Sequence, residues 1–392
     1  MDIPFNTRQL DELMEAESVD ALLVTSKHNV QYLLGGHRFF WFDYMDAVGV
    51  SRYLPVFVYF RGAPDASCFV GNAMEGFQIE NEPIWVQRIK AEAWGVRDAM
   101  NFALDAVRER LGTRARLGIE PSFLPVDALP VLEERGSYEL ADAEFLLERL
   151  RARKTGAELD LVEQASDRTV ESILEVFGGL EPGLTKRDAV ERLRIAEVER
   201  GLIFEYCLVS AGPNFNRAAS DDRLEEGDVI CLDSGGNYRG YIGDLARMGV
   251  LGSPDAELED ALAEVDAVQQ AARSAIGAGA LGRDVIAAGD ARLAKSRFAE
   301  RLAYVTHGMG LVSHEAPRIT ATGPVPYPDT DADAPLQPGM VLSVETTLWH
   351  ERRGFIKLED TVIVTDDGFR AVGDIGRGWN VCGQGAERLV SA

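Results

Sequence analysis

The stretch from Asp228 to Arg247 constrains the fold of this chain more than any other. It reads DVICLDSGGNYRGYIGDLAR, and its apolar run 229–232 is typical of a buried strand that delivers Asp233 at its end. We expect three glycines to turn the chain back toward a second short strand that ends near Asp244: Gly235, Gly236 and Gly240. Two carboxylates eleven residues apart on neighbouring strands then share one cavity, where their repulsion favours a cation between them. An acidic hairpin tip in an acidic protein is the alternative interpretation.

The composition narrows the classes of function. The 392 residues include 40 basic and 64 acidic side chains, which gives a formal net charge of −24. Nucleic acid and anionic membrane both require a positive surface, so neither is expected as a partner. The four cysteines are scattered without a CxxC pair, and the chain shows neither a leader peptide nor an apolar run of about 18 residues. These features predict a cytoplasmic protein.

Residues 1–150 alternate between helix and strand patterns, which predicts a small α/β domain. Buried strands are expected at 20–24, 53–60 and 117–119. The apolar spacing from Val96 to Leu111 predicts a helix that stops at Gly112. A charged run at 146–154 is expected to end a linking helix, which places the domain boundary near residue 150.

Residues 151–392 are expected to form a second, α+β domain. Thr185 begins a capping-box pattern for a helix that continues to about Glu199, and a strand is expected at 203–210. Helices on one side of a mostly antiparallel sheet would form this domain. The long helix that opens it carries five residues on one face: Leu161, Ala165, Thr169, Ile173 and Phe177.

Downstream strand patterns carry further residues of the kind that bind metals. His307 lies in YVTHGMG, and His314 follows seven residues later in SHEAP. Glu345 ends the apolar run 340–344, and Glu359 lies inside the strand pattern 356–364. A carboxylate in a hydrophobic strand is costly to bury unless it is paired or bound to a cation. Together with the two aspartates these residues suit a pair of Mn, Co, Fe or Zn ions, whereas pairing of each acid with a basic side chain is the alternative.

In this order and spacing the motifs resemble the creatinase/aminopeptidase P/prolidase family, the "pita-bread" metalloenzymes. The pattern is Asp, a second Asp eleven residues on, a distant HG-x-G with a His seven residues later, a Glu after an apolar strand, and a final Glu in front of Asp. The resemblance covers nearly the whole chain and includes NVQYLLG at residues 29–35. It implies a small N-terminal α/β domain and a C-terminal pita-bread domain, assembled as a homodimer.

The resemblance also implies a ligand set for two divalent ions, with Mn the first candidate and Co, Zn or Fe the others. Asp233 would bind one ion, and Asp244 and Glu359 would bridge both. His307 and Glu345 would complete the coordination of the second ion.

Two residues would have catalytic roles by the same resemblance. Glu345 would act as general base or acid, and His314 would contact the substrate and its transition state. A water molecule shared by two cations is deprotonated near neutral pH, and the resulting hydroxide can attack a peptide bond.

Two expected substrate-binding positions depart from the pattern of the proline-cleaving members. Asn216 stands where they have a His, and Lys357 stands where they have an Arg two residues before the last ligand. An amide does not titrate, and an ammonium lacks the planar fork of a guanidinium. Both changes predict weak cleavage of ordinary Xaa-Pro dipeptides, unless Arg217 or Arg353 compensates.

The leading prediction is a hydrolase that resembles Xaa-Pro dipeptidase or aminopeptidase P and cuts small peptides. A non-peptide C–N hydrolase or a lyase on the same scaffold, creatinase-like or sulfonium-lyase-like, is the main alternative. An inactive binding homologue is a further one. The aromatic stretch from Phe39 to Tyr44 is expected at a subunit boundary near the partner's site.

Overall fold

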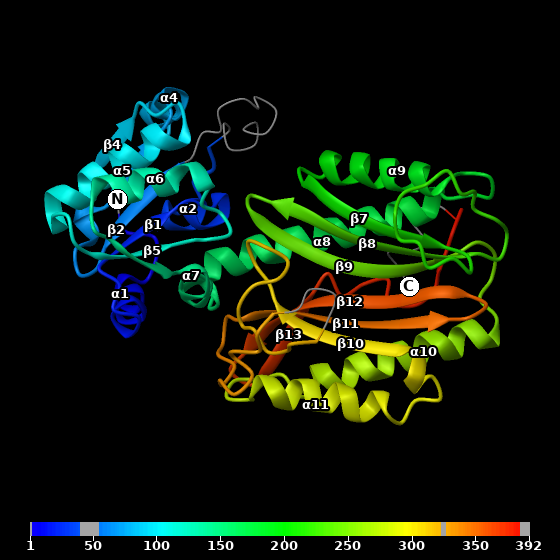
Figure 1. Ribbon diagram of the computed structural model, residues 1–392. Helices are drawn as coiled ribbons and strands as arrows, with labels where there is room; N and C mark the ends of the chain where they lie inside the picture. The colour runs from blue at the N-terminus through cyan, green and yellow to red at the C-terminus, as the bar shows by residue number, and fades with distance from the viewer. Residues whose placement is uncertain (1, 40–54, 323–326, 385–392) are drawn as a thin grey trace. The chain divides into compact units, whose positions relative to one another are not determined.

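The computed structural model describes residues 2–39, 55–322 and 327–384 (Figure 1). It divides into two compact units, Met1–Arg151 and Ala152–Ala392. Most of the aromatic stretch expected at a subunit boundary, from residue 40 onward, lies outside the described residues. Among the helices described, none is both long and apolar enough to cross a membrane.

The first unit is built on a six-stranded mixed sheet with the order β4-β3-β2-β1-β5-β6. Its strands are β1 (Ala21–Val24), β2 (Val56–Phe60), β3 (Cys68–Gly71), β4 (Arg88–Ala91), β5 (Arg116–Ile119) and β6 (Glu139–Asp142). Its helices are α1 (Thr7–Ala16), α2 (Lys27–Leu33), α4 (Ala73–Asn81), α5 (Val96–Leu111), α6 (Leu129–Arg135) and α7 (Glu144–Arg151).

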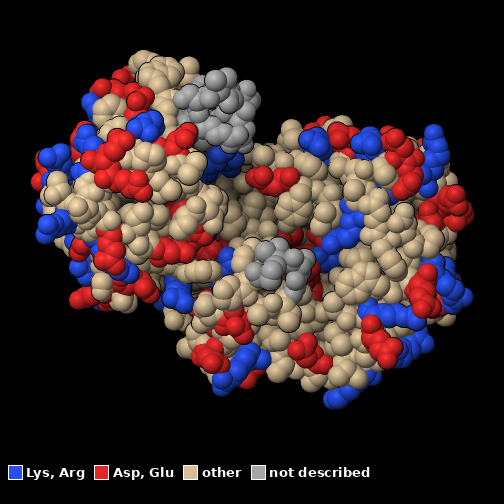
Figure 2. Space-filling model, in the orientation of Figure 1, with Lys and Arg blue, Asp and Glu red and all other residues tan. Residues whose placement is uncertain are grey.

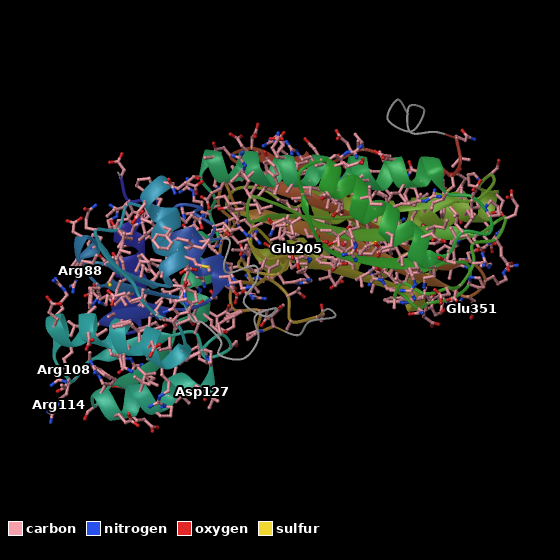
Figure 3. All side chains as sticks on the ribbon, turned by 90° about the horizontal axis from the view of Figure 1, so that it is seen from above. Arg88, Arg108, Arg114, Asp127, Glu205 and Glu351 are labelled. Atoms are coloured by element: carbon pink, nitrogen blue, oxygen red, sulfur yellow. The ribbon has the colours of Figure 1, made fainter. Side chains whose placement is uncertain are left out.

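This alternation confirms the α/β character expected of the first part of the chain. Helix α5 has the predicted bounds and packs on β2 and β3, and its C-cap Gly112 has φ of 77°, a conformation that suits glycine. Exposed arginines such as Arg88, Arg108 and Arg114 lie at the surface of this unit (Figure 3).

The second unit contains an eight-stranded sheet with the main order β10-β11-β12-β9-β8-β7, in which β13 pairs with β12 and β14 with β9. The strands are β7 (Ile203–Ala211), β8 (Val229–Tyr238), β9 (Tyr241–Val250), β10 (Leu302–Gly308), β11 (Val341–His350), β12 (Gly354–Thr365), β13 (Gly368–Val372) and β14 (Asn380–Val381). The α-helices are α8 (Gly156–Gly179), α9 (Lys186–Glu199), α10 (Ala256–Arg273) and α11 (Gly282–Leu293). All the strand pairs except β14–β9 are antiparallel, which confirms the α+β expectation.

Two pairs of helices cover this sheet. Helix α8 packs on β8 and β9 and α9 on β7, whereas α10 packs on β11 and β12 and α11 on β10 (Figure 1). The approach of α8 is close at Gly243, where an added Cβ would lie 2.5 Å from the backbone carbonyl carbon of Ala165. Because side chains alternate along a strand, Asp244 points to the face of β9 opposite α8.

The helix-covered face is also held by a buried ion pair. The guanidinium of Arg247 on β9 lies 2.8 Å from the carboxylate of Asp360 on β12, and both side chains are fully buried. Glu359, the neighbour of Asp360, therefore points to the same open face as Asp244. The sequence alternation thus separates structural charges from the candidate site.

The long helix α8 buries four of the five residues expected on its inner face, from Ala165 to Phe177. Leu161 is only half-buried, and Val162 is buried in its stead. The capping box at Thr185 and Asp188 forms as expected at the start of α9.

The hairpin turn corrects one expectation. Gly235 and Gly236 lie inside β8, and the turn consists of Arg239 and Gly240, whose φ angles are both positive at 52° and 101°. Two residues with positive φ are what a tight type I′ hairpin turn requires. The two strand glycines allow close packing instead. A Cβ added at Gly235 would lie 2.4 Å from the Tyr206 ring, and a Cβ added at Gly236 would lie 2.5 Å from Thr169 Oγ1.

Candidate metal centre

Five strands, β8 to β12, each place one expected ligand on the open face of the sheet. The registers bring these residues together: Asp233 pairs with Ala246, which in turn pairs with Glu359. Glu345 lies directly opposite Glu359, and His307 lies opposite Ser343, two residues before Glu345. All five side chains are buried, so each expected ligand emerges from an apolar strand into a shared interior.

Three of these residues form a group that can hold a metal ion: Asp244, His307 and Glu359. One potential ligand atom from each lies within 4.8 Å of the others. His307 Nε2 is buried without a hydrogen-bond partner among the described residues, and its nearest carboxylate oxygens, on Glu345 and Glu359, lie 3.8 Å away. His307 Nδ1 lies 3.3 Å from the Gly308 carbonyl, a contact that fixes the ring of many metal-binding histidines. The donor set therefore fits a divalent cation.

A lysine lies beside this group. Lys357 Nζ lies 2.6 Å from Asp233 Oδ2, 2.6 Å from Glu345 Oε2 and 2.7 Å from Glu359 Oε2. Those three carboxylates raise the pKa of Lys357 well above its usual value, although burial alone would lower it. The residue expected to bind substrate is thus a buried partner of three expected ligands.

Three further neighbours of the cluster were not among the expected ligands or catalytic residues. The guanidinium of Arg217 forms an ion pair with Asp233 and lies over the Phe355 ring, and Tyr206 hydrogen-bonds to Asp244. Ser343 Oγ donates to Glu359 Oε1 at 2.7 Å. Tyr206 and Ser343 lie within the strand patterns at 203–210 and 340–344, which is the only signal the sequence offered for them.

The carboxylates of the cluster are unequal. Burial raises the pKa of Asp244 well above its usual value, and the charges of Glu359 and Asp233 raise it further. Burial likewise raises the pKa of Glu345, against the opposing charge of Lys357. Burial works in the same direction on Glu359, but Lys357 and His307 outweigh it and hold its pKa below the usual range. Among the expected ligands, Asp244 is therefore the one whose charge is least compensated by neighbouring cations.

His314 stacks on His307, with ring centroids 3.8 Å apart and an angle of 17° between the rings. Burial and the neighbouring His307 lower the pKa of His314 to about 3. Both histidines line a pocket whose wall also includes Arg318 and Tyr327, with the guanidinium 3.6 Å from the centre of the Tyr327 ring. His314 thus borders both the metal group and a small pocket.

Asn216 lies on the exposed loop between β7 and β8. Its side-chain Oδ1 accepts a hydrogen bond from the backbone N–H of Ala218 at 3.0 Å. The backbone N–H of Asn216 donates to Asn214 Oδ1 at 2.8 Å. The neighbouring Arg217, and not Asn216, makes the contact with Asp233. Arg353 lies outside the cluster and pairs with Asp255 and Glu257.

Charged side chains of both signs lie on the surface. Lys and Arg side chains are interspersed with Asp and Glu over the face shown in Figure 2, without a continuous basic area among the residues drawn in colour.

Comparison with protein families assigns both parts of the chain. Residues 160–366 match the model of metallopeptidase family M24, and residues 7–153 match the creatinase/prolidase N-terminal domain. The fold and the buried acidic centre thus define a metallopeptidase, and the chain belongs to metallopeptidase family M24.

Individual relatives agree with this assignment. A probable dipeptidase PepE of Mycobacterium tuberculosis is 31% identical over 263 residues, which cover 66% of this chain and 68% of the relative. The Xaa-Pro dipeptidase of Pyrococcus horikoshii is 23% identical over 368 residues, 92% of this chain and 94% of the relative. The structure of an Xaa-Pro dipeptidase from Bacillus anthracis superposes with a TM-score of 0.79 at 21% identity and covers 96% of this chain and 98% of that one. These findings confirm the resemblance and the pita-bread fold.

Proposed function

We propose that this protein is a dinuclear-metal dipeptidase that hydrolyses a peptide bond in small peptides, in the manner of an Xaa-Pro dipeptidase. The observation that carries the proposal is the cluster on β8 to β12, which contains four buried carboxylates and an imidazole nitrogen that has no partner in the described structure. Four such carboxylates are costly to bury without cations. Membership of family M24 supports divalent ions as those cations.

The five ligands would divide between two ions, of which Mn²⁺ is the first candidate. Asp233 would hold one ion, His307 and Glu345 the other, and Asp244 and Glu359 would contribute to both. When bound, such ions lower the pKa of water and polarise a carbonyl oxygen. The oxygen-rich set favours Mn²⁺, whereas the single imidazole is compatible with Co, Zn or Fe.

Two residues of the chain would complete the chemistry. Glu345, at the edge of the cluster, would accept a proton from the attacking water and deliver it to the leaving nitrogen. His314, which is neutral above about pH 4 because its pKa is lowered to about 3, would donate a hydrogen bond to the oxygen on which charge develops. Its place on the pocket wall supports this role.

The side chains that line the small pocket beside His314 favour a short substrate. Arg318 supplies a positive group beside His314, and a guanidinium binds a carboxylate through paired hydrogen bonds. A dipeptide has its free carboxylate one residue beyond the bond that is cut, so Arg318 and the metal group would hold its two ends. The Tyr327 ring would offer an apolar surface to a proline ring.

A substrate panel tests this proposal. Mn²⁺-loaded protein is assayed on Ala-Pro, Met-Pro, Ala-Ala, a tripeptide and a small non-peptide amide, and kcat/KM is measured for each. We expect hydrolysis of dipeptides, with the Xaa-Pro substrates weak in the wild type and raised about 10-fold or more by Asn216→His, because one charged hydrogen bond is worth roughly 1.5–3 kcal/mol. Strong Xaa-Pro cleavage that Asn216→His does not raise would remove Asn216 from the substrate site. Turnover of the amide alone would replace the peptidase with a C–N hydrolase.

We further propose that the protein works as a cytoplasmic homodimer. The family resemblance and the free state of all four cysteines support this proposal. Light scattering at working concentration should give a mass near twice the 42.9 kDa of the chain. A stable monomer would contradict it.

A further inference from the structure

The two halves of the acidic cluster differ in what neutralises them. The group of Asp244, His307 and Glu359, here called the open set, has a buried imidazole nitrogen without a partner in the described part of the chain. No Lys or Arg of the described residues lies within ion-pair distance of Asp244. The open set is therefore a place for a cation that the protein itself does not fill.

The other half already holds a cation. The ammonium of Lys357 lies within 2.7 Å of one oxygen each of Asp233, Glu345 and Glu359, so its three N–H donors have three acceptors. Asp233 is also paired with Arg217. The side chain of Lys357 is 5% exposed, so water does not screen these contacts.

The position of Lys357 on its strand explains why it enters the cluster. It precedes Glu359 by two residues on β12, so both side chains leave the same face of the sheet. Glu345 uses one oxygen toward each half: Oε2 contacts Lys357, and Oε1 lies 3.8 Å from His307 Nε2. The ammonium and an ion held by Asp233 would thus compete for the same oxygens.

The net charge of the cluster also indicates that Lys357 and a second ion compete. The four carboxylates of the cluster carry four negative charges when ionised, and Lys357 and Arg217 supply two positive ones. One divalent ion in the open set makes the cluster neutral. A second ion adds two positive charges, and withdrawal of the ammonium would offset one of them.

We propose that Lys357 is a built-in competitor for the second metal ion, so that the open set binds first and the Asp233 side binds only when the ammonium is displaced. This inference rests on the proposed metal-dependent function and adds to it. It makes the protein a centre that holds one ion at low metal concentration and two at high concentration. Lys357 determines how far apart the metal concentrations are at which the first and the second ion bind.

Mn²⁺ binding to metal-free protein tests the proposal without an activity assay. Equilibrium dialysis with elemental analysis gives the two dissociation constants, and electron paramagnetic resonance distinguishes isolated Mn²⁺ from spin-coupled pairs. In the wild type we expect two constants at least about 10-fold apart and an uncoupled spectrum at one equivalent. Lys357→Met should strengthen the second step by about 10- to 100-fold, the range for removing a charged competitor, and give coupled pairs at lower Mn²⁺.

A control variant completes the test. Lys295→Met removes an exposed lysine with the same change in net charge and should behave as the wild type. Equal affinity for both ions in the wild type, or an unchanged second step in Lys357→Met, would overturn the role of Lys357. If Lys357→Met does not fold, the wild-type spectrum at one equivalent decides alone. A wild type that binds no Mn²⁺ at all would instead contradict the proposed function.

Discussion

At the scale of single residues, His314 is the group whose role can be separated most cleanly from metal binding. It stacks on His307 and lines the pocket, but it contributes no atom to the group that can hold an ion. We predict that His314→Ala keeps its metal and loses about 100-fold in kcat, because one donor to a developing oxyanion is removed.

The pH dependence of that loss follows from the lowered pKa. A histidine with a pKa of about 3 is neutral throughout the range from pH 5 to 9, so its removal takes away no titration in that range. The kcat profiles of wild type and His314→Ala should therefore have the same shape and differ only in height. Elemental analysis supplies the control, and a variant that is emptied of metal would make His314 a ligand.

The sequence identified the expected ligands because each one interrupts or ends an apolar strand, where an unpaired carboxylate or imidazole is costly. It did not identify the contacts of Lys357 or Arg217. Their partners lie on other strands, and a basic residue near an acid in sequence does not reveal which carboxylate its side chain reaches. Asp233, for example, forms ion pairs with Arg217 of the loop between β7 and β8 and with Lys357 of β12.

At the scale of elements, β9 packs closely on α8 at Gly243, on the face opposite Asp244. We predict that Gly243→Ala destabilises the protein by about 1–3 kcal/mol, because its Cβ would lie 2.5 Å from the backbone of Ala165 and the strand must shift. Thermal unfolding with calorimetry measures the loss. Gly156→Ala is the matched control, since a Cβ there meets nothing within 4 Å at the start of α8. Equal stability of the two variants would show that the approach of α8 does not constrain β9.

Elements were predictable where local sequence decides them, as in α5 and the capping box of α9. The hairpin shows the limit of such reasoning. Gly235 and Gly236 resemble turn residues, but each is glycine because a neighbour leaves no room for a side chain. These neighbours are Tyr206, 29 residues before Gly235, and Thr169, 67 residues before Gly236. Only the tertiary packing distinguishes a glycine in a turn from a glycine in a closely packed strand.

At the scale of the whole molecule, all five expected ligands and His314 belong to the unit Ala152–Ala392. The expected metal site thus lies within one unit, and its order of motifs is what predicted the fold class and the family. The substrate is a different matter. Asn216 and Lys357 depart from the pattern of proline-cleaving relatives, and motif spacing contains no information on the shape of the pocket beside His314.

The central claim is that the buried cluster on β8 to β12 is a metal centre that hydrolyses small peptides. Its most direct test is a Mn²⁺ titration of metal-free protein in which bound metal and the rate of dipeptide hydrolysis are measured on the same samples. We predict that the rate is absent without metal and rises with occupancy, and that Asp244→Ala and Glu359→Ala lose both bound metal and activity. Full activity in the metal-free wild type, or full metal content and activity in either variant, would contradict the claim.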